Sequence, residues 1–141
     1  MFELFAQIEI LEDVEEVTLP PLQVEITPLL KTGDPASPFE LASIRGANQI
    51  KSSGFDGKFV LLNFWTAATE DVKADQFMVQ EVYILLEEKY DLRLLSVNVD
   101  KEPKPAIDLI KTSKLAGPHG MTPGPEHPLF FNFGVRSVPS F

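Results

Sequence analysis

The order of the predicted elements indicates an α/β fold that contains a pair of parallel strands. Three observations predict it: an almost continuous apolar run over Phe59–Trp65, a long helical segment directly after it over Glu70–Tyr90, and a second apolar run over Leu92–Val99. A shorter helix is expected over Pro105–Ser113. Because a strand, a crossover helix and a second strand connect with right-handed chirality, the two strands are expected to lie parallel in one sheet.

The segment Phe59–Trp65 (FVLLNFW) is the strongest strand signal in the chain. It follows the turn pair Asp56-Gly57 and shows no alternation of apolar and polar residues, which is typical of a strand buried on both faces of a sheet. The segment Leu92–Val99 (LRLLSVNV) is interpreted as a second buried strand. Both strands are therefore expected to be buried.

The segment Glu70–Tyr90 contains no glycine or proline, and its apolar residues recur near helical spacing, which predicts a long helix. Thr69 is expected to cap this helix, and the carboxylates of Glu70 and Asp71 suit the positive end of its dipole. The apolar residues expected to face the core are Val72, Val79, Val82, Leu86 and Tyr90.

The compact part of the chain is expected to begin near residue 31. Lys31–Pro38 (KTGDPASP) is rich in glycine, proline and serine, which predicts a boundary. Phe39–Ser43 and Asn48–Ser52 then flank Arg45-Gly46 as a hairpin. We therefore predict a compact domain over 31–141, preceded by an acidic extended arm over 1–30.

The arm holds most of the excess negative charge. The first 36 residues contain eight carboxylates and one lysine, and the whole chain has a formal charge of -9. Phe5–Ile10 and Leu22–Ile26 alternate like strands, separated by the acidic run Glu12–Glu16 and by Pro20-Pro21. The arm is interpreted either as an extension of the domain or as the tail of a preceding domain.

Composition limits the classes of function. The negative charge repels phosphate backbones and anionic lipid, so nucleic-acid and membrane-surface binding are disfavoured. No stretch approaches the roughly 18 uninterrupted apolar residues of a membrane span, and the first residues lack the pattern of a signal peptide. Taken as written, the chain is expected in the cytoplasm, whereas a fragment of a longer protein could work outside it.

Three landmarks occur together: Gly57-Lys58 before the first strand, Phe64-Trp65 at its end, and Gly134–Pro139 (GVRSVP) near the last residue. With the entry segment Gly33–Leu41 (GDPASPFEL), they resemble the TlpA-like redoxins, which are relatives of thioredoxin. The resemblance covers residues 31–141. It implies a thioredoxin-like fold, with a central mixed sheet flanked by helices and an N-terminal extension.

The same resemblance implies that part of the fold lies outside this sequence. In the family, the proline that corresponds to Pro139 is followed by two strands and a helix, whereas this sequence ends at Phe141. The domain is therefore expected to lack its C-terminal hairpin and helix. Either the sequence is a fragment of a longer protein, which we favour, or the arm occupies the vacant place or pairs with a neighbouring subunit.

The resemblance also identifies where the chemistry of the family is lost, because the chain has no cysteine. The family carries Cys-x-x-Cys at the start of the helix after the Phe-Trp pair, and the matching positions are Thr69 and Val72. A threonine hydroxyl ionises far above a thiol pKa of about 8.5, and valine offers no polar atom. Dithiol exchange and thiolate attack on a peroxide are therefore excluded. Asn63 stands where thioredoxins often place an aspartate, and it cannot titrate.

By resemblance, Pro139 is a cis proline opposite the former cysteine turn, beside a backbone edge that docks extended peptides. This implies a binding groove for a protein or extended peptide, with Trp65 partly exposed. The plain alternatives are that Thr69–Asp71 only cap a helix and that Trp65 only packs in the core. The predicted groove residues are Trp65, Thr66, Thr69, Glu70, Val138 and Pro139.

The segment Gly117–Pro128 is rich in proline and glycine and is predicted to be a loop, followed by a short helix around Leu129–Asn132. His119, Glu126 and His127 lie in this loop, but their irregular spacing and the lack of cysteine argue against a metal site. No phosphate loop, nucleophile elbow or dinucleotide motif occurs. The sequence therefore assigns no catalytic residue, no metal and no cofactor.

Three hypotheses about function follow. The first is a redox-inactive thioredoxin-like domain that acts as a binding or scaffolding module through the predicted groove. The second is a member of a thiol-disulfide oxidoreductase family whose redox cysteines lie outside this chain. The third is a purely structural domain that holds neighbouring domains of a longer chain.

Overall fold

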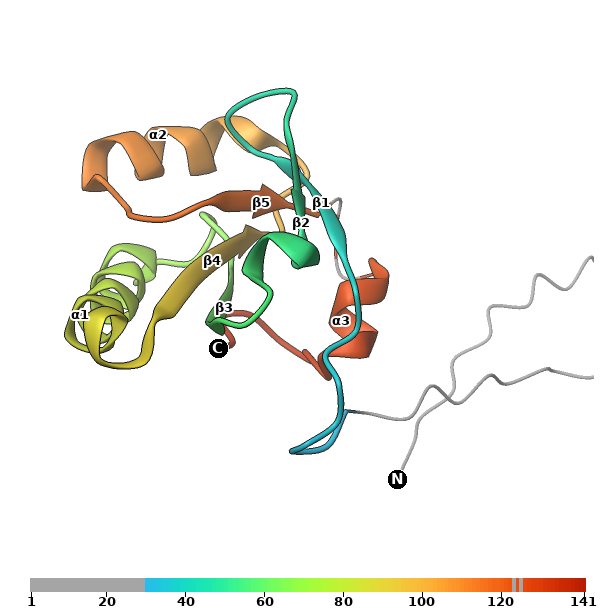
Figure 1. Cartoon of the computed structure of the whole chain (residues 1–141). Coiled ribbons are helices and arrows are strands. Elements are labelled where there is room, and N and C mark those ends of the chain that lie inside the picture. The colour runs from blue at the N-terminus through green and yellow to red at the C-terminus, as the bar shows by residue number, and fades with distance from the viewer. Residues whose placement is uncertain (1–29, 123, 125) are drawn as a thin grey trace, which may run out of the picture.

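The computed structural model describes residues 30–122, 124 and 126–141. They form a five-stranded mixed sheet with helices on both faces (Figure 1). The predicted α/β class is therefore confirmed. The arm predicted over 1–30 lies outside the described residues apart from Leu30, and it stays a prediction.

The hairpin and the parallel pair form as the sequence predicted. β1 (Glu40–Ser43) and β2 (Gln49–Lys51) pair antiparallel. A 3-10 turn, η1 (Ser52–Phe55), leads from them to β3 (Phe59–Trp65). β4 (Leu92–Asn98) then pairs parallel to β3, residue for residue along its whole length.

The structure contains one further strand that was not predicted. β5 (His119–Met121) lies in the segment predicted to be a loop. It pairs parallel to β4 and antiparallel to β1, which gives the sheet order β2-β1-β5-β4-β3. A Cβ at Gly120 would lie 2.9 Å from Leu41 Cδ1, so the Leu41 side chain of the neighbouring strand β1 packs closely against Gly120. A glycine inside a strand often marks such a close approach.

The helices agree with the prediction to within two residues at their starts. α1 (Val72–Tyr90) follows β3 after a short turn, and α2 (Pro103–Ser113) follows β4. α3 (Pro128–Asn132) is the predicted short helix. α1 and α2 lie on one face of the sheet and α3 lies on the other (Figure 1). No helix in the described part of the chain is long and apolar enough to cross a membrane.

Each face of the sheet has its own apolar cluster. On the α3 face, the rings of Phe64 and Phe130 meet edge to face with their centroids 5.4 Å apart. On the other face, Trp65 packs with Val72 of α1 and Ile110 of α2. Phe64 and Trp65 point to opposite faces because successive side chains of a strand alternate.

Two predictions about burial are wrong. β3 is buried only in its second half, and Phe59 at its start is 66% exposed, because β3 lies at the edge of the sheet. On α1, Val82 and Tyr90 are exposed although both were expected to face the core. The buried residues of α1 are Val72, Gln76 and Val79. The buried face thus includes a polar side chain, which apolar spacing alone does not find.

Candidate functional site

The turn between β3 and α1 is held by Asp100, which lies just past the end of β4. The Asp100 carboxylate accepts a hydrogen bond from the Thr66 hydroxyl and one of 2.8 Å from the Ala67 N–H. Asn98 Nδ2 donates to the same carboxylate at 2.9 Å. β3 and β4 are parallel, so their carboxyl ends meet at one edge of the sheet, and this brings Thr66 and Asp100 together.

Two further hydrogen bonds lie within the turn itself. Thr66 Oγ1 accepts from the Ala68 N–H at 3.2 Å, and the Thr69 hydroxyl donates to the Thr66 carbonyl at 3.5 Å. The prediction that Thr69 caps α1 is wrong, because Asp71 is the N-cap residue and no side chain makes a cap hydrogen bond there. The Thr69 side chain contributes to the turn instead.

The two positions that the resemblance aligns with the redoxin cysteines, Thr69 and Val72, differ in their surroundings. Thr69 is half-buried in the turn. Val72 is only 8% exposed and packs in the apolar cluster that contains Trp65 and Ile110. Val72 is therefore a core residue.

Trp65 does not line an exposed groove. It is 1% exposed and packs between the sheet and the residues of α2, so the expectation of partial exposure is wrong. The alternative, that this tryptophan packs in the core, is confirmed. Its Nε1 is buried without a hydrogen-bond partner among the described residues.

The remaining predicted groove residues lie around the carboxyl end of β3. Ser140 pairs antiparallel with Phe64 through two backbone hydrogen bonds of 2.8 and 3.1 Å. This register places Val138 and Pro139, which are joined by a cis peptide bond, beside the start of the turn. Pro139 and Glu70 are exposed, and Val138 is half-buried.

A row of buried polar side chains crosses the sheet beneath α1. Asn63, Ser96 and His119 occupy matching positions on β3, β4 and β5, and none is more than 4% exposed. Asn63 Nδ2 donates to Gln76 Oε1 of α1 at 2.8 Å and to Ser96 Oγ at 3.3 Å. Asn63 therefore ties the helix to the sheet.

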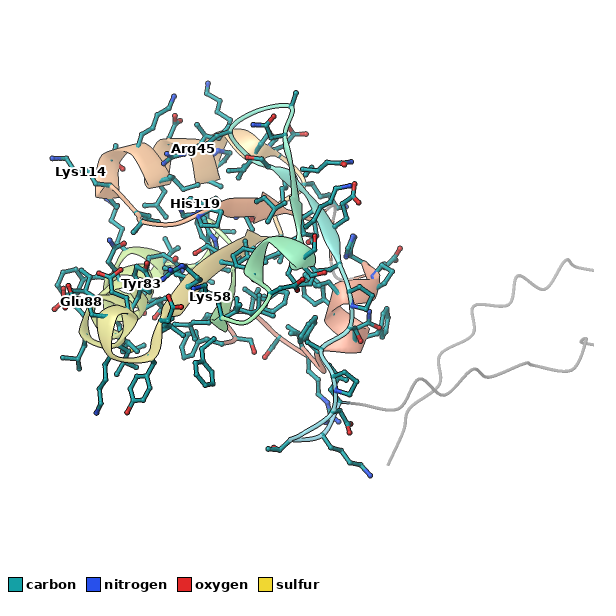
Figure 2. All side chains as sticks on the ribbon, in the orientation of Figure 1. Arg45, Lys58, Tyr83, Glu88, Lys114 and His119 are labelled. Carbon is teal, nitrogen blue, oxygen red and sulfur yellow. The ribbon has the colours of Figure 1, made fainter. Side chains whose placement is uncertain are left out.

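His119 is held in its neutral form. Burial of the ring lowers its pKa below the usual value, and the nearby positive charge of Arg45 acts in the same direction (Figure 2). The contact of 3.4 Å between His119 Nε2 and the Leu115 carbonyl opposes this shift only in part. The neutral ring suits this buried position, because a charged ring would lose its hydration there.

The three potential metal ligands of the loop do not converge. His119 is buried in β5, Glu126 is exposed, and His127 Nδ1 accepts a 3.2 Å hydrogen bond from the Leu129 N–H at the start of α3. In the part of the chain that the structure describes, no three such side chains form a group that could hold a metal ion.

The mixed sheet, with α1 and α2 on one face and α3 on the other, is a thioredoxin-like fold. The chain is similar to the thioredoxin domain of a thiol-disulfide oxidoreductase from Bacteroides vulgatus, with a TM-score of 0.65, 18% identity and 78% of each chain covered. It is also similar to a thiol:disulfide interchange protein named DsbE from Chlorobium tepidum, with a TM-score of 0.62 and 21% identity over 75% of this chain and 72% of that one. A secreted disulfide oxidoreductase from Mycobacterium tuberculosis matches with a TM-score of 0.60 and 14% identity, over 72% and 71%. No family model and no curated protein matches the chain.

Asp100 is the main residue of this site that was not predicted from the sequence. A signal for it exists, because it directly follows a predicted parallel strand. Functional side chains of parallel sheets gather at the carboxyl ends of strands. Gln76 and Ser96 carry no comparable signal, since each is a single polar residue within an otherwise ordinary helix or strand.

Proposed function

We propose that this chain is a redox-inactive thioredoxin-like domain that acts as a binding or scaffolding module. The observation that carries the proposal is the lack of cysteine, together with what stands at the two matching positions. The Thr69 hydroxyl is engaged within the turn, and Val72 packs in the core. Thiol-disulfide exchange requires an attacking thiolate and a second sulfur, and neither residue supplies one.

The proposed contact surface consists of Thr66, Thr69, Glu70, Val138 and Pro139. Trp65 is not included because it is buried. The hydrogen bonds to Asp100 hold one side of this surface in a fixed shape, which lowers the entropy cost of binding. We propose that its partner is a protein segment in extended conformation, or a neighbouring domain of a longer chain.

Insulin reduction by dithiothreitol tests the redox half of the proposal. We expect the native chain to leave the background rate unchanged and Thr69→Cys/Val72→Cys to accelerate it. Asp108→Cys/Lys111→Cys is the matched control, because it places two cysteines with the same spacing at exposed positions of α2, away from the turn. Acceleration by the native chain would show that the domain is not redox-inactive.

Amide chemical shifts of the full chain test the contact surface. The probe is the reduced and alkylated insulin B chain, a flexible polypeptide without free thiols. We expect shifts at Thr66, Thr69, Glu70 and Ser140, weakened by Glu70→Lys. Glu88→Lys, which reverses an exposed charge on α1 (Figure 2), should have no effect. If the turn does not respond, or if both charge reversals act equally, the contact surface lies elsewhere.

The second candidate is a thiol-disulfide oxidoreductase whose redox cysteines lie outside this chain. It is favoured by the similar structures, which are named as thiol-disulfide oxidoreductases. Mass spectrometry of the protein purified from its natural source tests this candidate. Cysteine-containing peptides that are continuous with this sequence would favour it, whereas a product without cysteine would exclude redox cysteines in a longer form of the same protein.

A further inference from the structure

The row of buried polar side chains beneath α1 contains two polar atoms without a partner. The row crosses three consecutive strands of the sheet, with Asn63 on β3, Ser96 on β4 and His119 on β5 (Figure 1). Asn63 is 0% exposed and His119 is 4% exposed. Asn63 Oδ1 and His119 Nδ1 make no hydrogen bond within the described part of the chain. Buried polar atoms are normally paired, so two unpaired atoms in one row point to a ligand between them.

Both of these atoms are hydrogen-bond acceptors. His119 Nε2 lies 3.4 Å from the Leu115 carbonyl oxygen, so Nε2 carries the proton of the neutral ring and Nδ1 presents a lone pair. Asn63 Nδ2 donates to Gln76 Oε1 and to Ser96 Oγ, which leaves Oδ1 as the free acceptor of the amide. A ligand that satisfies both atoms must therefore donate two hydrogen bonds.

The side chain between the two acceptors can supply a donor. Ser96 Oγ accepts the hydrogen bond from Asn63 Nδ2 at 3.3 Å. A hydroxyl group carries one proton besides its lone pairs, so Ser96 can also donate. The row thus offers a ligand two acceptors and one donor, contributed by three different strands.

The row is lowest at its centre. Neighbouring strands lie about 4.8 Å apart, so the backbones of Asn63 and His119 are separated by about 10 Å across Ser96, which has the smallest side chain of the three. Gln76 of α1 covers the row, because its amide oxygen bonds to Asn63. A buried water molecule typically has two to four polar partners. The position over Ser96 provides three.

We propose that one buried water molecule is bound over Ser96, where it donates to Asn63 Oδ1 and His119 Nδ1 and accepts from the Ser96 hydroxyl. Water matches this set, because its single oxygen atom carries two protons and can accept at the same time. A cation does not match, because the three side chains carry no charge and an unpaired buried charge is far more costly than a neutral molecule. The site joins β3, β4 and β5 and does not depend on the contact surface proposed above.

Water-selective nuclear Overhauser spectra of the full chain test this site. The probe is the carbon-bound Hε1 of His119, which is adjacent to Nδ1. A water molecule that stays bound while the protein tumbles gives laboratory-frame and rotating-frame effects of opposite sign, and we expect this pattern at His119. His127 is the chain's other histidine and the matched control. Its Nδ1 already accepts from the Leu129 N–H at 3.2 Å, so it should not show the pattern.

Two substitutions of Ser96 separate the space from the hydroxyl group. Ser96→Ala keeps both acceptors and the space but removes a proton that could relay magnetisation from solvent, so the signal at His119 should remain. Ser96→Val adds bulk over the row and should abolish the signal. Oxygen-17 relaxation dispersion should count one long-lived water molecule fewer in Ser96→Val than in the native chain. The amide spectrum away from the row shows whether each variant is folded.

Four results would overturn the proposal. Effects of equal sign at His119 in the native chain would show that no water stays bound there, whether or not the variants fold. A signal that persists in folded Ser96→Val would place the water elsewhere. A signal lost in folded Ser96→Ala, with an unchanged oxygen-17 count, would show that it was relayed from the hydroxyl. Nitrogen-15 shifts that put the ring proton on Nδ1 would remove one of the two acceptors.

Discussion

Removing the Asp100 carboxylate should destabilise the domain through the turn that follows β3. This carboxylate accepts three hydrogen bonds, from the Thr66 hydroxyl, the Ala67 N–H and Asn98 Nδ2. A hydrogen bond to a charged group contributes about 1.5–3 kcal/mol when it is buried. Asp100 is half-buried, so about 1 kcal/mol for each bond is a reasonable value. We therefore expect Asp100→Ala to lower the free energy of unfolding by about 3 kcal/mol.

Urea unfolding followed by Trp65 fluorescence measures this loss. Asp108→Ala is the matched control, because Asp108 is an exposed carboxylate on α2, and its replacement should change the free energy of unfolding by less than about 0.5 kcal/mol. A double-mutant cycle of Asp100→Ala with Thr66→Val isolates the bond between these two side chains. The coupling energy should be about 1 kcal/mol.

Two outcomes would count against this reasoning. If Asp100→Ala is no more destabilising than Asp108→Ala, the turn is held by its internal hydrogen bonds and Asp100 is not its anchor. If Asp100→Ala shows the full loss but the cycle gives no coupling, the stabilisation comes from the bonds to Ala67 and Asn98. The hydroxyl of Thr66 would then have no part in it.

Three further predictions concern the core and the sheet. Gly117 and Gly57 both have positive φ, so alanine should cost about 1–2 kcal/mol at each. Only at Gly117 would the new Cβ lie 2.7 Å from the Leu94 carbonyl oxygen, so urea unfolding should show a clearly larger loss for Gly117→Ala than for Gly57→Ala. The pKa of His119 is lowered in the folded state, so below about pH 6.5 the unfolded state binds the proton that the folded state excludes. The free energy of unfolding should therefore fall as the pH drops from 7 to 5, by at most about 1.4 kcal/mol per pH unit, and His119→Gln should flatten this dependence. Native Trp65 fluorescence should resist acrylamide quenching, and strong quenching would contradict its burial.

The sequence predicted those elements of the fold whose apolar signal is long. β3 matches the predicted range, and β4 differs by one residue, because a long and mostly apolar segment between a turn and a helix has few alternatives to a buried strand. β5 was missed because its three residues include a histidine and a glycine. Its place in the sheet depends on β1 and β4, and these tertiary partners leave no trace in the local sequence.

The buried face of α1 shows a second limit of apolar spacing. Gln76 lies on that face because its amide oxygen accepts a hydrogen bond from Asn63, so the cost of burying it is offset. The spacing of apolar residues along α1 cannot reveal this hydrogen-bonded pair, since Asn63 lies on β3. Val82 was assigned to the core because it continues the apolar spacing, although it is 42% exposed.

The candidate site was predicted in position but not in detail. Thr66, Thr69 and Pro139 lie around one end of β3, where the resemblance placed them. Trp65 was misplaced because a tryptophan at the end of a strand can turn toward solvent or toward the core, and the packing of α2 decides between them. The residues that hold the site, above all Asp100, become evident only when the ends of β3 and β4 are seen together.

The start of the turn is held by residues other than Thr69 and Val72, and the Thr69 hydroxyl adds one hydrogen bond of 3.5 Å within the turn. Asp100 and Asn98 hold its start, and their hydrogen bonds involve neither the side chain of Thr69 nor that of Val72. Replacing both by cysteine should therefore introduce two thiols while the hydrogen bonds to Asp100 remain. If the double variant reduces insulin while the native chain does not, the turn is able to position two thiols for exchange with a disulfide. In the native chain the surface at the end of β3 carries no thiol, and we propose that it serves binding instead.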